Sequence, residues 1–149
     1  MKINFKAAGK ADAELIVEMM RTFYYHEQLE FNYENNLKIV HQLLLNHEIG
    51  NIFLIFYDEK LIGYVVFTYG FSIEYEGILT LIDEIYIQEE FRNKGIGTMT
   101  LNYVEEICKA KGIKTIHLQV KNFNPQAKKL YNSLGYKDID RVFMKKIAL

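Results

Sequence analysis

The sequence contains little of what would indicate a disulfide scaffold, a metal site or a membrane span. Its 149 residues include a single cysteine, Cys108, a single proline, Pro125, and no tryptophan. One cysteine permits neither an intramolecular disulfide nor a cysteine-based metal site, and it suits a reducing compartment. The N-terminus has no apolar core of the signal-peptide kind, and apolar runs such as 52–57 are too short to cross a bilayer. We therefore expect a cytoplasmic protein with no metal and no membrane partner.

An excess of charge of one sign is also absent. The 18 Lys and Arg residues nearly balance the 19 Asp and Glu residues, which gives a net charge of −1, and no basic run stands out. A nucleic-acid partner is therefore not expected. Half of the residues are apolar and a quarter are charged, which is typical of a globular protein. The length suits one domain, so we expect a single domain over residues 1–149.

The hydrophobic pattern predicts a mixed α/β fold. Apolar alternation predicts strands over 2–7, 51–57, 61–71, 77–87 and 114–121, with one or two more in 136–148. Helical spacing predicts helices after residue 12, from about residue 35, over 96–111 and after residue 124. Helices that follow inner strands imply locally parallel βαβ units, whereas the early hairpin is antiparallel. The expected fold class is therefore α/β (α+β mixed sheet), with helices on both faces of the central sheet.

Helix-capping residues support these boundaries. Asp12 is expected to cap the first helix, and Asn124 is expected to cap the last, with Pro125 at its first position. Gly112 and Gly135 are expected to end the two later helices. The acidic, aromatic stretch at residues 24–34 is expected to be a loop or a frayed helix end.

The segment "FRNKGIG" predicts a phosphate site where a strand leads into a helix. The first N–H groups of a helix have no intrahelical partner and carry partial positive charge. Gly95 and Gly97 would let an anion approach those groups, and Arg92 and Lys94 add positive charge beside them. Together these features predict a cradle for a pyrophosphate.

Other phosphate motifs fit this segment less well. The P-loop pattern G-x-x-x-x-G-K-[ST] is absent, and Thr100 stands where a dinucleotide-binding fingerprint has its third glycine. The G-x-G pair alone is also compatible with a simple turn, so that alternative stays open at this point.

Two segments in the right order resemble the GNAT superfamily of N-acetyltransferases. The segment "IYIQEEFRNKGIGTMTL" resembles motif A of that family, [QR]-x-x-G-x-[GA], with Arg92, Gly95 and Gly97 at the fixed places. The segment "NFNPQAKKLYNSLGY" resembles motif B, with matches at Asn124, Ala127, Tyr131, Gly135 and Tyr136. Mild departures are Glu89, where proline is common, and Asn93, where glycine is common.

The resemblance implies a GNAT-like N-acyltransferase fold and acetyl-CoA as co-substrate, with direct transfer to an amine in a ternary complex. It implies that the pantetheine arm pairs with the backbone of Ile85, Tyr86 and Ile87. It places the pyrophosphate on the amides of Arg92, Asn93, Lys94, Gly95, Ile96, Gly97 and Thr98. It adds contacts to the cofactor from Asn124, Ala127 and Tyr131. A homodimer is common among similar proteins.

A protonated amine must lose a proton before it can attack, because the pKa of an alkylamine is ~10.4. Asp83 and Glu84 are adjacent carboxylates within an apolar strand, so only one of them can face the acceptor unless a bulge intervenes. Glu84 is the favoured base and Asp83 the second candidate, and the alternative is that both are solvated at a strand end. Tyr131 matches the family's general acid, although its position also suits a core residue.

The acceptor site and the reaction class leave alternatives. Tyr24, Tyr25, Glu27 and Phe31 would suit a cationic amine through charge and cation–π contact, or they belong to an ordinary solvated loop. The acceptor is expected to be a small-molecule amine or a lysine side chain. Gln119 stands where family members that acetylate protein N-termini carry a glutamate base, which disfavours that reaction without excluding it. A non-catalytic acyl-CoA sensor on the same fold is the other alternative.

Overall fold

The computed structural model describes residues 2–122 and 124–149, and it contains the predicted strands and helices in order as far as the last helix. The strands are β1 (Ile3–Ala7), β2 (Gly50–Tyr57), β3 (Lys60–Ser72), β4 (Gly77–Ile87) and β5 (Ile116–Leu118). The helices are α1 (Ala13–Glu27), α2 (Tyr33–Leu44), α3 (Ile96–Ala110) and α4 (Pro125–Ser133), with short 3-10 helices at Lys10–Asp12 and Glu89–Phe91. The chain forms two compact units, residues 1–119 and 120–149, so the single domain stays a prediction.

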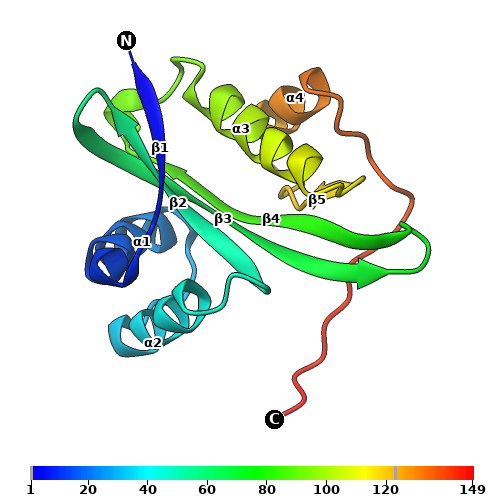
Figure 1. The fold of residues 1–149 in the computed structure, drawn as a ribbon, viewed down its shortest axis with the longest axis horizontal. Coiled ribbons are helices and arrows are strands. Elements are labelled where there is room, and N and C mark those ends of the chain that lie inside the picture. The colour runs from blue at the N-terminus through cyan, green and yellow to red at the C-terminus, as the bar shows by residue number, and fades with distance from the viewer. Residues whose placement is uncertain (1, 123) are drawn as a thin grey trace. The chain divides into compact units, whose positions relative to one another are not determined.

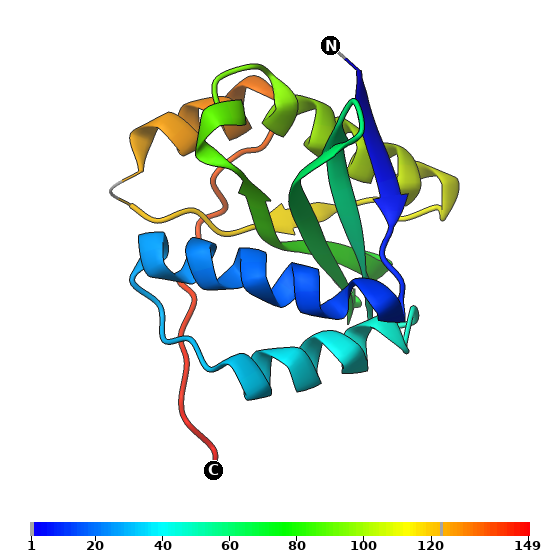
Figure 2. The same ribbon diagram turned by 90° about the vertical axis from the view of Figure 1, so that its left-hand side faces the viewer.

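The first unit is a five-stranded mixed sheet with helices on both faces, as predicted. The strand order is β1-β2-β3-β4-β5; the first four strands pair antiparallel, and β5 pairs parallel to β4 after the α3 crossover. Helices α1 and α2 cover one face and α3 covers the other (Figure 1). Figure 2 shows α1 and α2 side by side beneath the sheet.

Each face of the sheet has its own apolar core. The α1 face buries aliphatic side chains of both helices against β2, β3 and β4, among them Ile16, Val17, Met20, Val40, Leu54 and Val66. On the α3 face, Tyr103 stacks on Phe5 with ring centroids 4.3 Å apart and meets Phe53 edge-on at 5.2 Å. The strand β4 therefore lies between two cores, and the direction of each β4 side chain decides which core it faces.

The segment 24–34 is more ordered than predicted. Helix α1 takes up its first part and ends at Glu27, and the next residue, Gln28, has the left-handed backbone conformation, φ 56°. The side chain of Asn32 accepts the Asn35 N–H at 2.9 Å and so caps α2. The predicted loop therefore shrinks to residues 28–32, because a local cap supports the second helix earlier than apolar spacing alone suggested.

Two other predicted helix boundaries had different outcomes. Asp12 occupies the N-cap position of α1, as predicted, but its carboxylate accepts the Gly9 N–H at 2.8 Å and makes no capping bond to α1. The preceding 3-10 turn uses that side chain first. Gly112 follows α3 with φ 71°, which confirms it as the residue that ends this helix.

The second unit contains α4. The Asn124 side chain accepts the Ala127 N–H at 3.1 Å, with Pro125 at the first turn, and Gly135 follows the helix with φ 92°. The strands predicted within 136–148 are wrong, because these described residues form no strand. A strand needs a backbone partner, and sequence alternation does not supply one. Lys128 instead pairs with Asp138 at 2.8 Å. In the described part of the chain, no helix is long and apolar enough to cross a bilayer.

Candidate active site

A bulge in β4 interrupts the pairing with β3 at the two predicted carboxylates. Val66 of β3 pairs with Glu84, and the next residue, Phe67, pairs with Ile82. Asp83 is therefore an extra residue that has no partner across the ladder. The sequence did not decide whether a bulge separates the two carboxylates, and the structure contains one.

The extra residue reverses the direction in which the later side chains of β4 point. Thr80 lies before the bulge, and its Oγ1 is 3.2 Å from the Cys108 Sγ of α3. In a regular strand Glu84, four residues later, would face the same helix. The Glu84 side chain instead meets Tyr24 of α1 on the opposite face. The bulge therefore directs Glu84 toward α1 and α2.

Two tyrosine hydroxyls hold the Glu84 carboxylate. Tyr24 Oη donates to Oε2 at 2.5 Å, and Tyr64 Oη, from β3, donates to Oε1 at 2.8 Å. The Tyr64 side chain is fully buried, whereas Tyr24 and Glu84 are half-buried. Burial and the nearby Glu84 charge raise the pKa of both tyrosines, so both hydroxyls keep their protons and act as donors.

The two carboxylates have different surroundings. Burial raises the pKa of Glu84, and the hydrogen bonds from Tyr24 and Tyr64 partly oppose that shift. Asp83 is exposed, and its carboxylate has no side-chain partner among the described residues; desolvation by neighbouring atoms alone raises its pKa. Glu84 is thus fixed in orientation and Asp83 is not. For both carboxylates the pKa therefore lies above its ordinary value. A raised pKa is expected of a carboxylate that accepts protons near neutral pH.

Aromatic rings surround Glu84 on the α1 side. Tyr24 meets Phe31 edge-on at 6.0 Å, and Phe23 lies 5.9 Å from Tyr86. The Arg21 guanidinium lies 4.9 Å from the centroid of the Phe31 ring. In this structure the cation–π contact on the Phe31 ring is therefore made by Arg21 of the same protein.

The predicted acceptor residues do not all join this aromatic group. Tyr24 and Phe31 do. Tyr25 is 80% exposed, and its ring meets the His26 ring edge-on at 5.8 Å. Glu27 is the last residue of α1. The prediction thus separates into Tyr24, which binds Glu84, with Phe31 packed on it, and the exposed Tyr25 and half-buried Glu27 at the end of α1.

Beyond the bulge, one edge of β4 has no strand beside it. Strand β5 pairs with Thr80, Leu81 and Ile82 and then ends at Leu118. Ile85, Tyr86 and Ile87 remain paired to β3 on their other edge. Within the described residues, the β5-side backbone of these three residues has no ladder partner, which is the arrangement that a strand-like ligand needs.

A glycine lets β3 approach this part of β4 closely. A Cβ at Gly63 would collide with the carbonyl oxygen of Tyr86. Gly63 pairs with Ile87 in the ladder. The absence of a side chain at this position therefore fixes Tyr86 and Ile87 against β3.

The predicted phosphate turn has a backbone suited to an anion. Asn93 and Gly95 both have left-handed conformations, φ 59° and φ 78°, and asparagine tolerates this region better than most residues. Asn93 is thus an acceptable substitute for the glycine common in motif A. The first helical bond of α3 runs from Met99 N to Gly95 O, at 3.1 Å. The amides of Ile96, Gly97 and Thr98 precede that bond at the positive end of the helix.

Arg92 is anchored at the start of this turn. Its Nε donates to the Ile87 carbonyl oxygen at 2.8 Å, and its guanidinium carbon lies 6.0 Å from the Tyr86 ring centroid. The side chain is exposed. One guanidinium edge is therefore committed to the end of β4, while the group as a whole places positive charge beside Tyr86.

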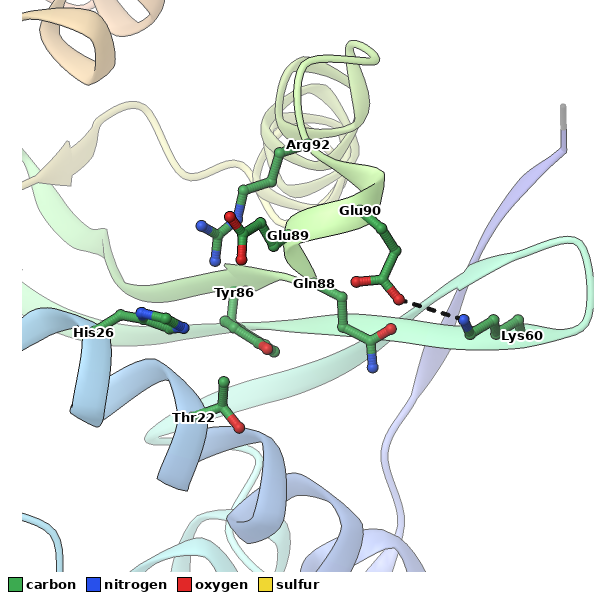
Figure 3. A pocket seen from close by; sticks show the side chains of 8 residues that line it. All are labelled: Thr22, His26, Lys60, Tyr86, Gln88, Glu89, Glu90 and Arg92. Carbon is green, nitrogen blue, oxygen red and sulfur yellow. Dashed lines mark ion pairs between the residues drawn. The ribbon is translucent and has the colours of Figure 1, made fainter.

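A pocket of about 440 Å³ lies beside the end of β4. It is lined by Thr22, His26, Lys60, Tyr86, Gln88, Glu89, Glu90 and Arg92. Figure 3 shows Tyr86 in the middle, with Thr22 and His26 of α1 on one side and Arg92 on the other. The pocket brings together two predicted cofactor residues, Tyr86 and Arg92, but it does not include Glu84.

Sequence reasoning missed several residues of this region, among them Tyr64, Thr22 and His26. Tyr64 binds Glu84 from β3, and Thr22 and His26 line the pocket from α1. Thr22 and His26 are four residues apart, so one face of the helix presents both. That spacing was visible in the sequence. The position of Tyr64 opposite β4 depends on strand register, which the sequence does not display.

The residues of motif B lie in the second unit. Asn124 caps α4, Ala127 donates the capping bond, and Tyr131 lies further along the same helix, 6.0 Å from the Tyr136 ring centroid. The described residues contain no group of three or more His, Cys, Asp or Glu side chains that could hold a metal ion.

Comparison with known proteins gives one consistent family. Residues 13–136 match the model of the acetyltransferase (GNAT) family. The thialysine N-epsilon-acetyltransferase of Bos taurus is 31% identical over 78 residues, which are 52% of this chain and 45% of that protein. The chain thus spans about half the length of the curated relatives it matches first.

Solved structures of similar proteins cover the whole chain. A protein of Clostridium difficile 630, described as a possible acetyltransferase, has a TM-score of 0.88 at 25% identity, covering 100% of this chain and 99% of its own. A predicted acetyltransferase of Clostridium acetobutylicum, solved with acetyl-CoA, has a TM-score of 0.82 at 18% identity, covering 97% and 96%. At 18% identity, the similarity to this second structure shows that the two proteins share a fold and no more.

Proposed function

Because this chain belongs to the acetyltransferase (GNAT) family, we propose that it transfers an acetyl group from acetyl-CoA to a primary amine. The observation that carries the proposal is the bulge at Asp83, which turns Glu84 toward the α1 face at the point where β4 loses its β5 partner. A held carboxylate thus lies next to an open strand edge. These are the two parts that amine activation and thioester binding require.

Acetyl-CoA binds along the end of β4 in this proposal. The amides of the pantetheine arm pair with the open backbone of Ile85–Ile87, and the pyrophosphate lies on the amides of residues 92–98. The pocket beside Tyr86 and Arg92 accommodates polar atoms at the junction of these two parts. The left-handed conformations at Asn93 and Gly95 support this assignment, because they point successive amides toward one place.

Glu84 acts as the general base. It takes a proton from the ammonium group of the acceptor, directly or through one water, and the free amine attacks the thioester carbonyl. A backbone N–H near Ile85 stabilises the oxyanion of the tetrahedral intermediate. The attacking nitrogen loses its remaining extra proton to water, and collapse of the intermediate breaks the carbon–sulfur bond to give the neutral amide and the CoA thiolate. The surrounding tyrosine and phenylalanine rings favour an alkylammonium over an anionic acceptor.

We assign Tyr131 as the acid that protonates the leaving thiolate on the basis of its motif B position. Replacing Tyr131 with Phe removes the donated proton and leaves the ring. We expect kcat to fall by about 10² to 10⁴ while CoA affinity stays within twofold. Steady-state kinetics and a CoA titration of the same preparation check this. An unchanged kcat would remove Tyr131 from the mechanism.

The acceptor class is a small-molecule amine or a lysine side chain. The name of the bovine relative, thialysine N-epsilon-acetyltransferase, supports a lysine-like ε-amine. The test is CoA release from acetyl-CoA across a panel of diamines, lysine analogues and lysine peptides. Turnover with a member of this panel supports the proposal. Tight CoA binding without turnover on any amine would favour the non-catalytic sensor. The cytoplasmic location and the homodimer stay predictions.

A further inference from the structure

We propose that Tyr24 is a positioning residue that holds the Glu84 carboxylate in place and links it to the start of α2. This inference rests on the proposed function, because it assigns a role toward the proposed base. It goes further, since neither the sequence motifs nor the aromatic composition of the 24–34 segment identifies a residue that acts through Glu84.

The hydroxyl of Tyr24 donates its one proton to the Glu84 carboxylate. A phenol has a single proton to donate, and here it goes to Glu84 Oε2 at 2.5 Å. The Asn36 side chain of α2 lies beside this contact: its Nδ2 is 3.9 Å from the Met20 Sδ of α1, and its amide lowers the pKa of Tyr24. An amide donor beside the phenol oxygen favours the orientation in which the phenol proton points at Glu84.

The backbone around Tyr24 ties this contact to the acceptor-side loop. The Tyr24 carbonyl oxygen accepts the Leu29 N–H at 2.9 Å, just after the left-handed Gln28 that ends α1. Its ring meets Phe31, two residues before α2 begins at Tyr33. The loop 28–32 therefore packs on the same side chain whose hydroxyl holds Glu84.

The groups that act on Glu84 are few. Tyr24 contributes from α1, Tyr64 from β3 and the Asp83 charge from β4, while α2 acts through Asn36. Both tyrosine bonds favour the ionised carboxylate, whereas burial and the Asp83 charge favour the protonated one. Removing the Tyr24 hydroxyl deletes one of two favourable bonds and leaves the unfavourable effects in place. The pKa of Glu84 must then rise.

The test replaces Tyr24 with Phe and measures two quantities in the full-length protein. The first is the pKa of Glu84, followed by its side-chain carboxyl carbon resonance in an NMR titration, which needs no turnover. The second is the acid limb of the pH profile of kcat/KM with the best amine of the panel. We expect both midpoints to move up by about one pH unit, because a hydrogen bond to a charged group is lost.

Tyr25→Phe is the matched control, since it makes the same chemical change one residue away at an exposed ring. It should move neither midpoint. Asn36→Ala should move both in the same direction by less, because Tyr24 keeps its hydroxyl but loses its orienting donor. It also serves if Tyr24→Phe does not fold, as judged by the dispersion of its NMR spectrum.

The outcomes separate the two proposals. A raised Glu84 pKa with a matching shift of the acid limb supports the positioning role. An unchanged Glu84 pKa in both Tyr24→Phe and Asn36→Ala overturns it, even if the wild type is active. A raised Glu84 pKa with an acid limb that does not move shows that Tyr24 holds Glu84 but that Glu84 is not the base, which overturns the role in catalysis and the base assignment together.

Discussion

The two ends of the proposed site along β4 are built from different parts of the chain. At its C-terminal end, the turn into α3 offers backbone amides, shaped by the left-handed residues Asn93 and Gly95. At the bulge, Glu84 is held by the side chains of Tyr24 and Tyr64, which lie 60 and 20 residues away in the chain. The first end depends on local conformation and the second on tertiary packing. They should therefore fail in different ways when they are altered.

The largest effect is expected at the side-chain end, from Glu84→Gln. This change keeps the shape of the side chain but removes the group that accepts the proton. We expect kcat/KM to fall by about 10² to 10⁴, with CoA affinity within twofold of the wild type. Amine-saturation kinetics and isothermal titration with CoA check both values. A parallel loss of CoA affinity would erase the proposed division between the two ends.

The stability of the same variant gives a control on folding. The pKa of Glu84 is raised in the folded state, so ionisation weakens wild-type folding as the pH rises through that pKa. Glutamine does not ionise. Its Nε2 donates and cannot accept, so one of the two tyrosine hydrogen bonds is lost at every pH. The Tm of Glu84→Gln relative to the wild type should therefore be highest at pH 7 and fall toward pH 4. A loss of Tm at pH 7 large enough to unfold the variant at the assay temperature would show that the activity loss comes from misfolding.

A smaller effect is expected at the backbone end, from Gly95→Ala. The left-handed conformation costs a residue with a Cβ about 1–2 kcal/mol, whereas the added atom itself meets nothing within 4 Å. We expect the KM for acetyl-CoA to rise by about tenfold with kcat within twofold, as measured by varying acetyl-CoA at saturating amine.

Gly112→Ala is the matched control for this change. Gly112 also has a left-handed conformation, φ 71°, and open space for a Cβ, but it lies at the other end of α3. It should lower the Tm by a similar amount and leave the KM for acetyl-CoA unchanged. If both variants raise that KM equally, the turn at Gly95 has no special role in donor binding.

The smallest effect is expected from Asp83→Asn. Asp83 is exposed and its carboxylate has no side-chain partner in the described part of the chain, so we expect kcat/KM to change by less than tenfold. Measuring kcat/KM of Asp83→Asn and Glu84→Gln under the same conditions shows which variant loses more activity. A larger loss in Asp83→Asn than in Glu84→Gln would reassign the base to Asp83.

The same contrast explains what the sequence could predict. Gly95, Gly97 and the Asn124 cap act through nearby backbone, so short motifs identified them and the strands and helices around them. The first residue of α2 was predicted at about residue 35 instead of Tyr33, because the prediction did not use Asn32 as the cap. The strands expected after residue 136 failed because alternation specifies side-chain faces and not a pairing partner.

The network around Glu84 could not be predicted in the same way. Its direction depends on one unpaired residue in β4, and Tyr64 reaches it only through the register of β3. Neither feature leaves a local pattern. The sequence identified the adjacent carboxylates and the aromatic segment, while their connection is a property of three-dimensional packing.

The bulge at Asp83 also decides where β4 can tolerate a change of length. Before it, the strand contributes Thr80 to the core under α3; after it, Tyr86 packs beside Phe23 of α1. Deleting Asp83 alone would remove the bulge without turning either layer, because the pairs Val66–Glu84 and Phe67–Ile82 are already consecutive in the ladder. An extra residue inserted between Glu84 and Tyr86 would instead turn Tyr86 away from Phe23 and toward α3. The exposed tip between β3 and β4 should accept insertions without that reversal.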